Sequence, residues 1–393
     1  MDSMNDNKHT MSDLYQMQSL PLNAKIQMTK RRIDEWVDKF GEDGCYASFS
    51  AGKDSTVLVD IIRNICGYKE IPLVFIDVPT QYPELKQFAQ TFGNLVILKP
   101  KISFAEVCEK YGFPLFSKET SECIAASKRY IKILTDRQTD RQTLHFACRI
   151  ADLIGIDRRK GSNKLYEDLK RGNIPIEIIK SPVRFRQLLG IKSDDFGNKY
   201  DKSRYLFMLD APFDVSNQCC SVMKKQPAKK YHKETGRVPI TAQMAHESLL
   251  RTSQWIKNGC NGFNMKIPTS NPMSFWTEND VLYYIKHNNL PICPVYGEVV
   301  IDYESMGRCE KQISMGEYGL VEEVPILKTT GCDRTGCVLC GFGCHLEKES
   351  RFERLKETHP KFHNLLFKLK NNGVSYAEAL DWVNKHGGFN IKY

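Results

Sequence analysis

Two groups of residues in this 393-residue chain have types and spacings that could do chemistry. The first is the string Ser50-Ala51-Gly52-Lys53-Asp54-Ser55, in which small residues would let backbone N–H groups approach an anion while the lysine supplies a positive charge. The second is the adjacent pair Cys219-Cys220 together with the distant Cys337-x-x-Cys340. Four thiolates suit Zn²⁺ or an iron–sulfur cluster, and the spacing alone does not choose between them.

The first group predicts a phosphate-binding loop. It leaves an expected strand at 45–50 and opens an expected helix at 56–65, so the helix N-terminus would add positive potential. It is not the G-x-x-x-x-G-K-[ST] loop, because Asp54 follows the lysine. The candidate nucleotide-binding residues are Ser48, Ser50, Ala51, Gly52, Lys53, Asp54, Ser55 and Asp77.

The elements that must position these residues predict an α/β fold with a doubly wound parallel sheet. Strands alternate with helices, and ligands in such sheets bind at the carboxyl ends of the strands. Thr277, with Asp280 three residues later, nearly matches a capping box at the start of a helix. The expected elements are a helix over 20–45, strands at 45–50, 71–77, 94–100 and 237–244, and helices at 56–65, 274–289, 349–370 and 375–386.

The chain divides into five expected segments, which end in a helical, loop-rich region that holds the second cysteine group. They are a helical lead-in (1–45), a nucleotide-binding α/β core (46–124), a basic insertion (125–210), the remainder of the core with the Cys-Cys pair (211–330), and the cysteine cluster with closing helices (331–393).

The composition favours a protein of the cytoplasm with an anionic partner. The net charge is +9, the first residues are polar, and no apolar run approaches the length of a membrane span. Cytoplasmic thiols stay reduced, so the 14 cysteines are not expected to form disulfides. The dispersed Cys45, Cys66, Cys108 and Cys148 are interpreted as small buried hydrophobic residues.

The basic insertion is predicted to contact the phosphates of a nucleic acid, either DNA or transfer RNA. The competing interpretation is a solvated face or a surface for a protein partner. The basic residues concerned are Lys128, Arg129, Lys132, Arg137, Arg141, Arg158, Arg159 and Lys160.

The loop resembles the PP-loop, S-x-G-K-D-S, of ATP pyrophosphatases and sulfonucleotide reductases, with Ala51 where the commonest form has glycine. The segment "VFIDVPTQYPEL" resembles the reductase segment in which an acidic residue ends the second strand and Tyr-Pro-Glu follows. The resemblance implies that Asp77 lies near the adenosine or a metal ion. Val78-Pro79 replaces the usual Thr-Gly, so contacts to the nucleotide could differ there.

The cysteines resemble those of adenylyl-sulfate reductases, in which a Cys-Cys pair and a later C-x-x-C bind a [4Fe–4S] cluster beside the nucleotide. "GRVPITAQMAHESLLR", "PMSFWTENDVLYYI" and "NLPICPVYG" also resemble segments of that superfamily. The resemblance runs from about Ser48 to Cys340, without 125–210. It implies a member of the phosphoadenosine-phosphosulfate (PAPS)-reductase-like PP-loop superfamily that binds ATP or a related adenine nucleotide, with magnesium as a candidate companion. It favours a [4Fe–4S] cluster over zinc, with ligands Cys219, Cys220, Cys337 and Cys340.

The chain departs from the reductases in its tail. Those enzymes attack sulfur with a cysteine in a Glu-Cys-Gly-Leu-His-type motif, whereas no cysteine follows Cys344 here. The candidate catalytic residues are therefore Lys53, Asp54, Asp77 and Cys344. Arg251, Arg334 and Cys332 complete the candidate site: Arg334 could face an anion or neutralise a cluster, and Cys332 could be a ligand, a reactive thiol or a spectator.

Three functions remain open on the sequence. In the first, ATP activates a substrate and the cluster assists sulfur transfer, with a nucleic acid as a candidate target and a cysteine desulfurase or other sulfur donor as partner. The likeness to a bacterial and phage group of reductase-like PP-loop proteins, related in design to the PP-loop component of DNA phosphorothioation systems, favours this version. The second is a sulfonucleotide reductase with a relocated thiol. The third is a non-catalytic regulator that binds a nucleotide and senses through the cluster.

Overall fold

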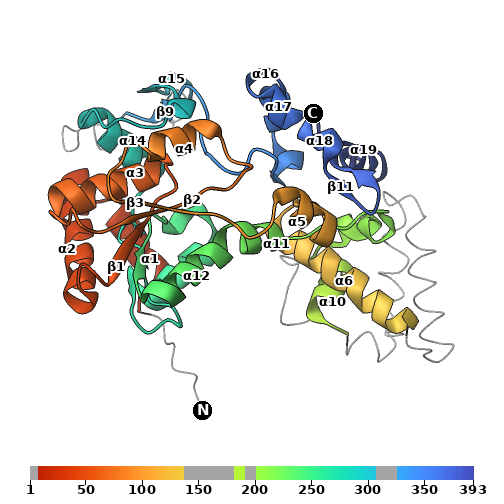
Figure 1. The fold of residues 1–393 in the computed structure, drawn as a ribbon, viewed down its shortest axis with the longest axis horizontal. Helices are drawn as coiled ribbons and strands as arrows, with labels where there is room; N and C mark the ends of the chain where they lie inside the picture. Colours follow the sequence, from red (N-terminus) through yellow and green to blue (C-terminus); the bar gives the residue numbers. More distant parts are fainter. Residues whose placement is uncertain (1–7, 137–180, 191–200, 307–324) are drawn as a thin grey trace, which may run out of the picture. The chain divides into compact units, whose positions relative to one another are not determined.

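The computed structural model describes residues 8–136, 181–190, 201–306 and 325–393 (Figure 1). The chain forms two compact units, each made from two separate stretches. The first unit contains Met1–Pro100 and Gln226–Gly336, and the second contains Lys101–Lys225 and Cys337–Tyr393. No helix in the described ranges is both long and apolar enough to span a membrane.

A six-stranded sheet forms the centre of the first unit. All neighbouring strands run parallel except the last two, and β1, β2 and β5 are almost wholly buried. Buried strands of this kind are typical of parallel sheets covered on both faces, so the predicted α/β class is confirmed. The order is β3 (Leu95–Leu98), β2 (Leu73–Ile76), β1 (Cys45–Ser48), β5 (Val238–Ile240), β7 (Thr269–Ser270) and β6 (Asn261–Gly262).

The connections make this sheet doubly wound. Helix α3 (Lys53–Asp60) joins β1 to β2, α4 (Pro83–Ala89) joins β2 to β3, and α13 (Leu249–Asn258) joins β5 to β6. Strands β2 and β3 follow outward from β1 on one side, and β5, β7 and β6 lie on the other side. The direction in which strands are added to the sheet changes between β1 and β5. In doubly wound folds, ligands bind at this switch point.

The remaining elements of the first unit pack around this sheet. They are α1 (Met11–Gln18), α2 (Leu22–Phe40), a π-helical turn (Ile61–Ile65), α12 (Gln226–Thr235), a 3₁₀ turn (Ala245–Glu247), α14 (Glu278–His287), a second 3₁₀ turn (Pro294–Tyr296), α15 (Tyr303–Met306) and the antiparallel pair β8 (Val299–Ile301) and β9 (Leu327–Thr329). Helix α2 is shorter than predicted because Gly41, with φ of 76°, ends it. The predicted capping box of α14 is present.

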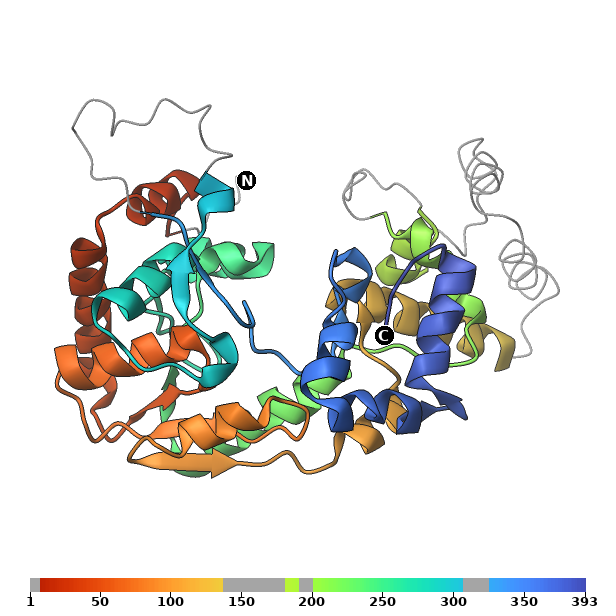
Figure 2. The same cartoon turned by 90° about the horizontal axis from the view of Figure 1, so that it is seen from above.

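The second unit is mainly helical, and Figure 2 shows its C-terminal helices from above. Phe113 stacks on Tyr376 with ring centroids 4.6 Å apart, and Phe213 and Leu380 are buried with them. Its elements before the C-terminal region are α5 (Phe104–Tyr111), β4 (Leu115–Phe116), α6 (Lys118–Asp136), α10 (Val183–Leu188), a 3₁₀ helix (Ser203–Asp210), α11 (Gln218–Cys220) and a π-helical turn (Ser221–Lys225). The expected segment boundary at residue 125 thus lies inside α6.

The C-terminal region differs from the prediction in one respect. The helix expected over 349–370 is broken into α16 (Arg351–Thr358), α17 (Pro360–His363) and α18 (Leu365–Lys368). Pro360 cannot donate a backbone hydrogen bond, and His359 before it takes a non-helical conformation. Elsewhere in this region lie β10 (Gly341–Phe342), which pairs with β4, a 3₁₀ turn (Cys344–Leu346), the hairpin of β11 (Lys370–Asn371) and β12 (Val374–Ser375), and α19 (Tyr376–Gly387).

Candidate functional site

The predicted phosphate loop connects β1 to α3 in the first unit. Ala51 has φ of 59°, in the left-handed region, which explains why glycine would also suit this position. Gly52 is the N-cap of α3 and has no side chain with which to cap this helix end. A methyl group on Gly52 would lie 3.1 Å from both Ser50 Oγ and the Tyr296 hydroxyl, so the loop is closely packed there.

Lys53 is held by oxygen atoms. Its Nζ lies 3.1 Å from Glu278 Oε1, 3.1 Å from the Asp333 carbonyl oxygen and 3.6 Å from Asp54 Oδ1. The side chain is only 4% exposed. Burial alone would lower the pKa of Lys53, but Asp54 and Glu278 raise it above its ordinary value. The ammonium is therefore charged and lies at the start of α3.

The Asp54 carboxyl has a pKa above its ordinary value. Burial raises its pKa and Glu278 adds to the effect, while Lys53 and Arg334 oppose it. Its Oδ1 is buried and receives no hydrogen bond from any residue that the structure describes. The contact of this oxygen is instead the ion pair with Lys53 Nζ at 3.6 Å.

Two arginines lie within electrostatic range of the loop. Burial lowers the pKa of Arg251, and repulsion from Arg334 lowers it further. Arg251 also donates a hydrogen bond to Glu247. Arg334 is exposed, and within the described ranges no hydrogen bond or ion pair engages its side chain. Two guanidinium groups that repel each other beside a phosphate loop could bind a second anionic group.

The stretch that begins at Cys332 packs on the loop. The Tyr296 hydroxyl accepts a hydrogen bond from the Lys53 backbone N–H at 3.2 Å and lies 2.6 Å from Thr335 Oγ1. Cys332 is buried, and its Sγ donates to the Tyr82 hydroxyl at 3.6 Å. Glu278, Tyr296 and Thr335 were not predicted as site residues, because only the folding of distant segments brings them to Lys53.

Asp77 follows β2 at the same carboxyl edge of the sheet. Its carboxylate pairs with Lys86 at 2.7 Å, on α4, rather than with the phosphate loop. It borders a cavity of about 520 Å³, lined also by Lys86, Gln90, Ile97, Leu98, Lys99, Pro227, Lys230, Tyr231 and Glu234. This volume is in the range of small-molecule pockets.

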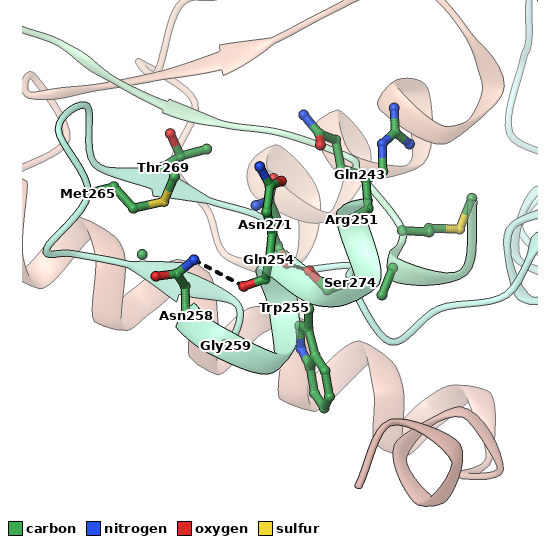
Figure 3. Close-up of a pocket in the computed structure, with 13 residues that line it drawn as sticks. Gln243, Arg251, Gln254, Trp255, Asn258, Gly259, Met265, Thr269, Asn271 and Ser274 are labelled. Carbon is green, nitrogen blue, oxygen red and sulfur yellow. Dashed lines mark hydrogen bonds between the residues drawn. The ribbon is translucent and has the colours of Figure 1, made fainter. Parts of the chain in front are cut away.

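A smaller cavity lies under α13, around the residues labelled in Figure 3. Its volume is about 20 Å³, and its lining includes Arg251, Gln254 and Asn271. This is room for a water molecule among polar groups, and it is too small for a nucleotide.

The four predicted thiol ligands all belong to the second unit, within electrostatic range of one another. The side chains of Cys219 and Cys220 on α11 are hydrogen-bonded to each other, and Cys337 and Cys340 interact electrostatically with Cys219. The hydrogen bond and burial raise the pKa of Cys219, whereas the same hydrogen bond lowers that of Cys220. Lys224, four residues beyond Cys220, has a raised pKa because it lies beside Cys337.

These thiols suit a soft metal or an iron–sulfur cluster in type and number. In the described parts of the chain, however, no three Cys, His, Asp or Glu side chains lie at metal-binding distance from one point. The four thiols therefore match a metal or cluster in residue type and number, but their positions in the structure do not form a metal site. Sequence reasoning missed Lys224, although a lysine one helical turn after Cys220 was a usable signal.

Cys344 lies near this group but is buried, and burial raises the pKa of its thiol to about 12. It is therefore protonated at neutral pH, which is unfavourable for a nucleophile.

The ammonium of Lys128, in the predicted basic insertion, is engaged within the protein. Its Nζ donates hydrogen bonds to the carbonyl oxygens of Ala211 and Phe213. Arg129 and Lys132 lie on the same helix, α6, whereas Arg137, Arg141, Arg158, Arg159 and Lys160 lie outside the described residues. Cys148 also lies outside them. Of the other dispersed cysteines, Cys45 and Cys108 are buried and Cys66 is partly buried.

Comparison with known proteins found similarity to PAPS and adenylyl-sulfate reductases. Residues 177–341 match the model of the phosphoadenosine phosphosulfate reductase domain, a span that includes all four thiols and both arginines but not the phosphate loop. Adenosine 5′-phosphosulfate reductase of Allochromatium vinosum is 26% identical over 204 residues, which are 45% of this chain and 75% of that protein.

A solved structure of phosphoadenylyl-sulfate reductase from Candida auris, in complex with phosphate, aligns with 72% of this chain and 90% of its own. The TM-score is 0.33 and the identity 14%. The fold assignment therefore rests on the strand order described above.

Proposed function

We propose that the protein binds a sulfonucleotide, through its adenosine 5′-phosphate group, at Ser50–Ser55 and reduces the sulfate group with thiols. The observation that carries this proposal is the position of Lys53, buried at the start of α3 after the loop that follows β1. Helix N-termini bind phosphate through free backbone N–H groups and the helix dipole. The match of residues 177–341 to the PAPS reductase domain supports the choice of substrate class.

The arginines supply a place for the second anionic group. A sulfonucleotide carries a sulfate joined to the 5′-phosphate, so two anionic groups enter together. An anion beside Arg251 and Arg334 would relieve the repulsion that lowers the pKa of Arg251. The cavity beside Asp77 lies at the same edge of the sheet and has room for part of a nucleoside.

The reaction would need two thiols. A thiolate attacks the sulfur atom, the bond from sulfur to the bridging oxygen breaks, and the nucleoside 5′-phosphate leaves. A second thiol then attacks the first sulfur, which releases sulfite and leaves a disulfide. Cys344 is buried and protonated, so an external dithiol is the expected reductant in this proposal.

We also propose that Cys219, Cys220, Cys337 and Cys340 hold a [4Fe–4S] cluster. The support is the gathering of four thiols with Lys224, whose charge would balance that of a thiolate-bound cluster. Such a cluster would supply a charged centre with redox capacity.

A second candidate is ATP-dependent activation of a substrate with transfer of sulfur. It is favoured by the resemblance of Ser50–Ser55 to the loop of ATP pyrophosphatases. In this version the phosphate loop would bind ATP and release pyrophosphate.

One experiment separates the two candidates. The anaerobic protein is incubated with dithiothreitol and either adenylyl sulfate, phosphoadenylyl sulfate or ATP, and sulfite and pyrophosphate are measured. The proposal predicts sulfite from a sulfonucleotide and none with Lys53→Ala, while Lys30→Ala, a change in a partly exposed helical ion pair, keeps the activity. Pyrophosphate from ATP without sulfite would favour the second candidate.

A further inference from the structure

Both groups of Lys53 that a phosphate would use are already engaged within the protein. The backbone N–H of Lys53 donates to the Tyr296 hydroxyl at 3.2 Å, and the ammonium donates to the Asp333 carbonyl oxygen at 3.1 Å. The ammonium also lies 5.7 Å from the centre of the Tyr296 ring. Oxygen atoms of the protein therefore accept the hydrogen bonds that the start of α3 would give to a bound phosphate.

These oxygen atoms are linked through one short segment, Asp333–Thr335, which we call the strap. The Tyr296 hydroxyl lies 2.6 Å from Thr335 Oγ1. A methyl group on Gly52 would lie 3.3 Å from the same Thr335 oxygen, so the strap rests directly against the phosphate loop. Burial raises the pKa of Tyr296, so its hydroxyl is neutral and can accept from Lys53. All of these residues belong to the first unit.

The strap is anchored on its N-terminal side. The Gly331 N–H donates to the Tyr296 carbonyl oxygen at 2.8 Å, and the Cys332 N–H donates to the Val295 carbonyl oxygen at 3.0 Å. Among the residues that the structure describes, the strap itself is hydrogen-bonded only to Lys53 and Tyr296. The strap can therefore lift from the loop while the anchor before it stays in place.

A phosphate at Ser50–Ser55 and the strap would compete for Lys53. A phosphate could replace the Asp333 carbonyl and the Tyr296 hydroxyl with oxygen atoms that carry negative charge, and such hydrogen bonds are stronger than those to neutral acceptors. The measured affinity would then be reduced by the small fraction of molecules in which the strap is open.

We propose that the strap, together with the Tyr296 hydroxyl, is an autoinhibitory contact that closes the phosphate loop and is displaced by the phosphate of the nucleotide. The inference rests on the proposed binding of an adenine nucleotide at Ser50–Ser55, and it couples that binding to a movement of the strap. Arg334 is the central residue of the strap, so the same displacement would move the guanidinium that we assign to the second anionic group.

The first test needs no nucleotide and uses trypsin, which cleaves after arginine. Tyr296→Phe removes the hydroxyl between Lys53 and Thr335, so the strap should open more often. Cleavage after Arg334, followed by mass spectrometry of the fragments, should become about two- to tenfold faster, as the net loss of one hydrogen bond would give. Tyr68→Phe is the matched control, because its hydroxyl bonds to Asp34 in the same unit, and it should be cleaved at the wild-type rate.

The second test is calorimetric titration with AMP, which has the adenosine 5′-phosphate of every candidate substrate. Tyr296→Phe should bind AMP about two- to tenfold more tightly than the wild type, because the strap competes less. Thr335→Val keeps the Tyr296 hydroxyl and should also gain affinity, while Tyr68→Phe should not. Saturating AMP should speed cleavage of the wild type after Arg334, whereas a ligand that only stabilises the closed form would slow it. Circular dichroism checks that each variant is folded.

The outcomes distinguish this inference from the proposed function. Equal cleavage after Arg334 in the wild type, Tyr296→Phe and Thr335→Val would overturn the strap, whatever the result with AMP. Unchanged or weaker AMP binding by Tyr296→Phe, or slower cleavage of the wild type with AMP, would overturn its displacement by phosphate. Faster cleavage of Tyr296→Phe without AMP binding by any of these proteins would refute nucleotide binding at the loop, while confirming that Tyr296 holds the strap closed.

Discussion

Lys53 and its neighbours show what single residues reveal about this protein and what they do not. The string Ser50–Ser55 predicted a phosphate loop because the chemistry is local to six residues. Glu278 and Tyr296 could not be found in this way, since each depends on the packing of a distant segment against the loop. The strained backbone of Ala51 was also not predicted, because alanine gives no sign of a positive φ.

Gly52→Ala is expected to weaken the site by crowding. The added methyl would lie 3.1 Å from Ser50 Oγ and Tyr296 OH and 3.3 Å from Thr335 Oγ1, all of which belong to the bonded network around the loop. We expect the free energy of unfolding to fall by about 1–3 kcal/mol, as for other overpacked sites, and nucleotide affinity to fall with it. Urea denaturation and nucleotide titration measure both.

Gly93→Ala is the matched control for this change. A methyl at Gly93 meets nothing within 4 Å, and its backbone is not in the left-handed region. Equal effects of the two substitutions would mean that crowding at Gly52 is not the cause.

Asp54→Asn is expected to stabilise the free protein at neutral pH. The folded state raises the pKa of Asp54 above 3.8, so ionisation of this acid destabilises the fold. Below about pH 3.8 the acid is protonated in both states, and the variant should have no advantage. The advantage should appear as the pH rises through the folded-state pKa. Urea denaturation at several pH values tests this, and a stability difference that does not change with pH would contradict it.

At the scale of elements, local signals predicted best. The strands around β1 and the capped start of α14 follow from hydrophobic runs and from Thr277 with Asp280. The short pair β4 and β10 could not be predicted, because two-residue strands have no pattern and their pairing joins distant parts of the chain. Pro360 indicates a break in the sequence, but the helical spacing of apolar residues on both sides of it predicts one continuous helix.

The ion pair of Lys25 with Asp280 ties α2 to the start of α14. Lys25→Ala would leave Asp280, which is 15% exposed, without its counter-ion. Removal of one partner from a buried pair costs about 3–5 kcal/mol, so we expect a loss of free energy of unfolding of this order. Denaturant unfolding provides the measurement.

Lys30→Ala on the same helix is the control. Lys30 pairs with Asp34 one turn away, with both side chains about one-third exposed. Such pairs contribute about 0.3–0.5 kcal/mol, so the two losses should differ clearly. Similar losses would show that the buried pair contributes little.

At the scale of the whole molecule, each unit is assembled from two separate stretches of the chain. The five expected segments followed composition along the sequence, which cannot reveal that Lys101–Lys225 folds with Cys337–Tyr393. The thiol group shows the same limit, because residue types alone group Cys219-Cys220 with Cys337-x-x-Cys340 but cannot show that the two are close in space. The structure brings these side chains within electrostatic reach of each other.

The proposed cluster predicts iron in the anaerobically purified protein. Iron and acid-labile sulfide should be present in about four atoms each per chain, with broad visible absorption. Cys337→Ser should lose most of this iron, whereas Cys66→Ser, outside the thiol group and in the first unit, should keep it. Elemental analysis that finds one zinc and no iron would contradict the cluster.

The most direct test of the central claim is calorimetric titration of the anaerobic protein with adenylyl sulfate in the absence of reductant. The claim is that the nucleotide phosphate binds at Ser50–Ser55 through Lys53. Lys53→Ala should weaken binding by about 1.5–3 kcal/mol, roughly 10- to 150-fold, as for loss of a hydrogen bond to a charged group. Lys30→Ala should bind as the wild type does. Unchanged affinity in a folded Lys53→Ala protein would contradict the claim.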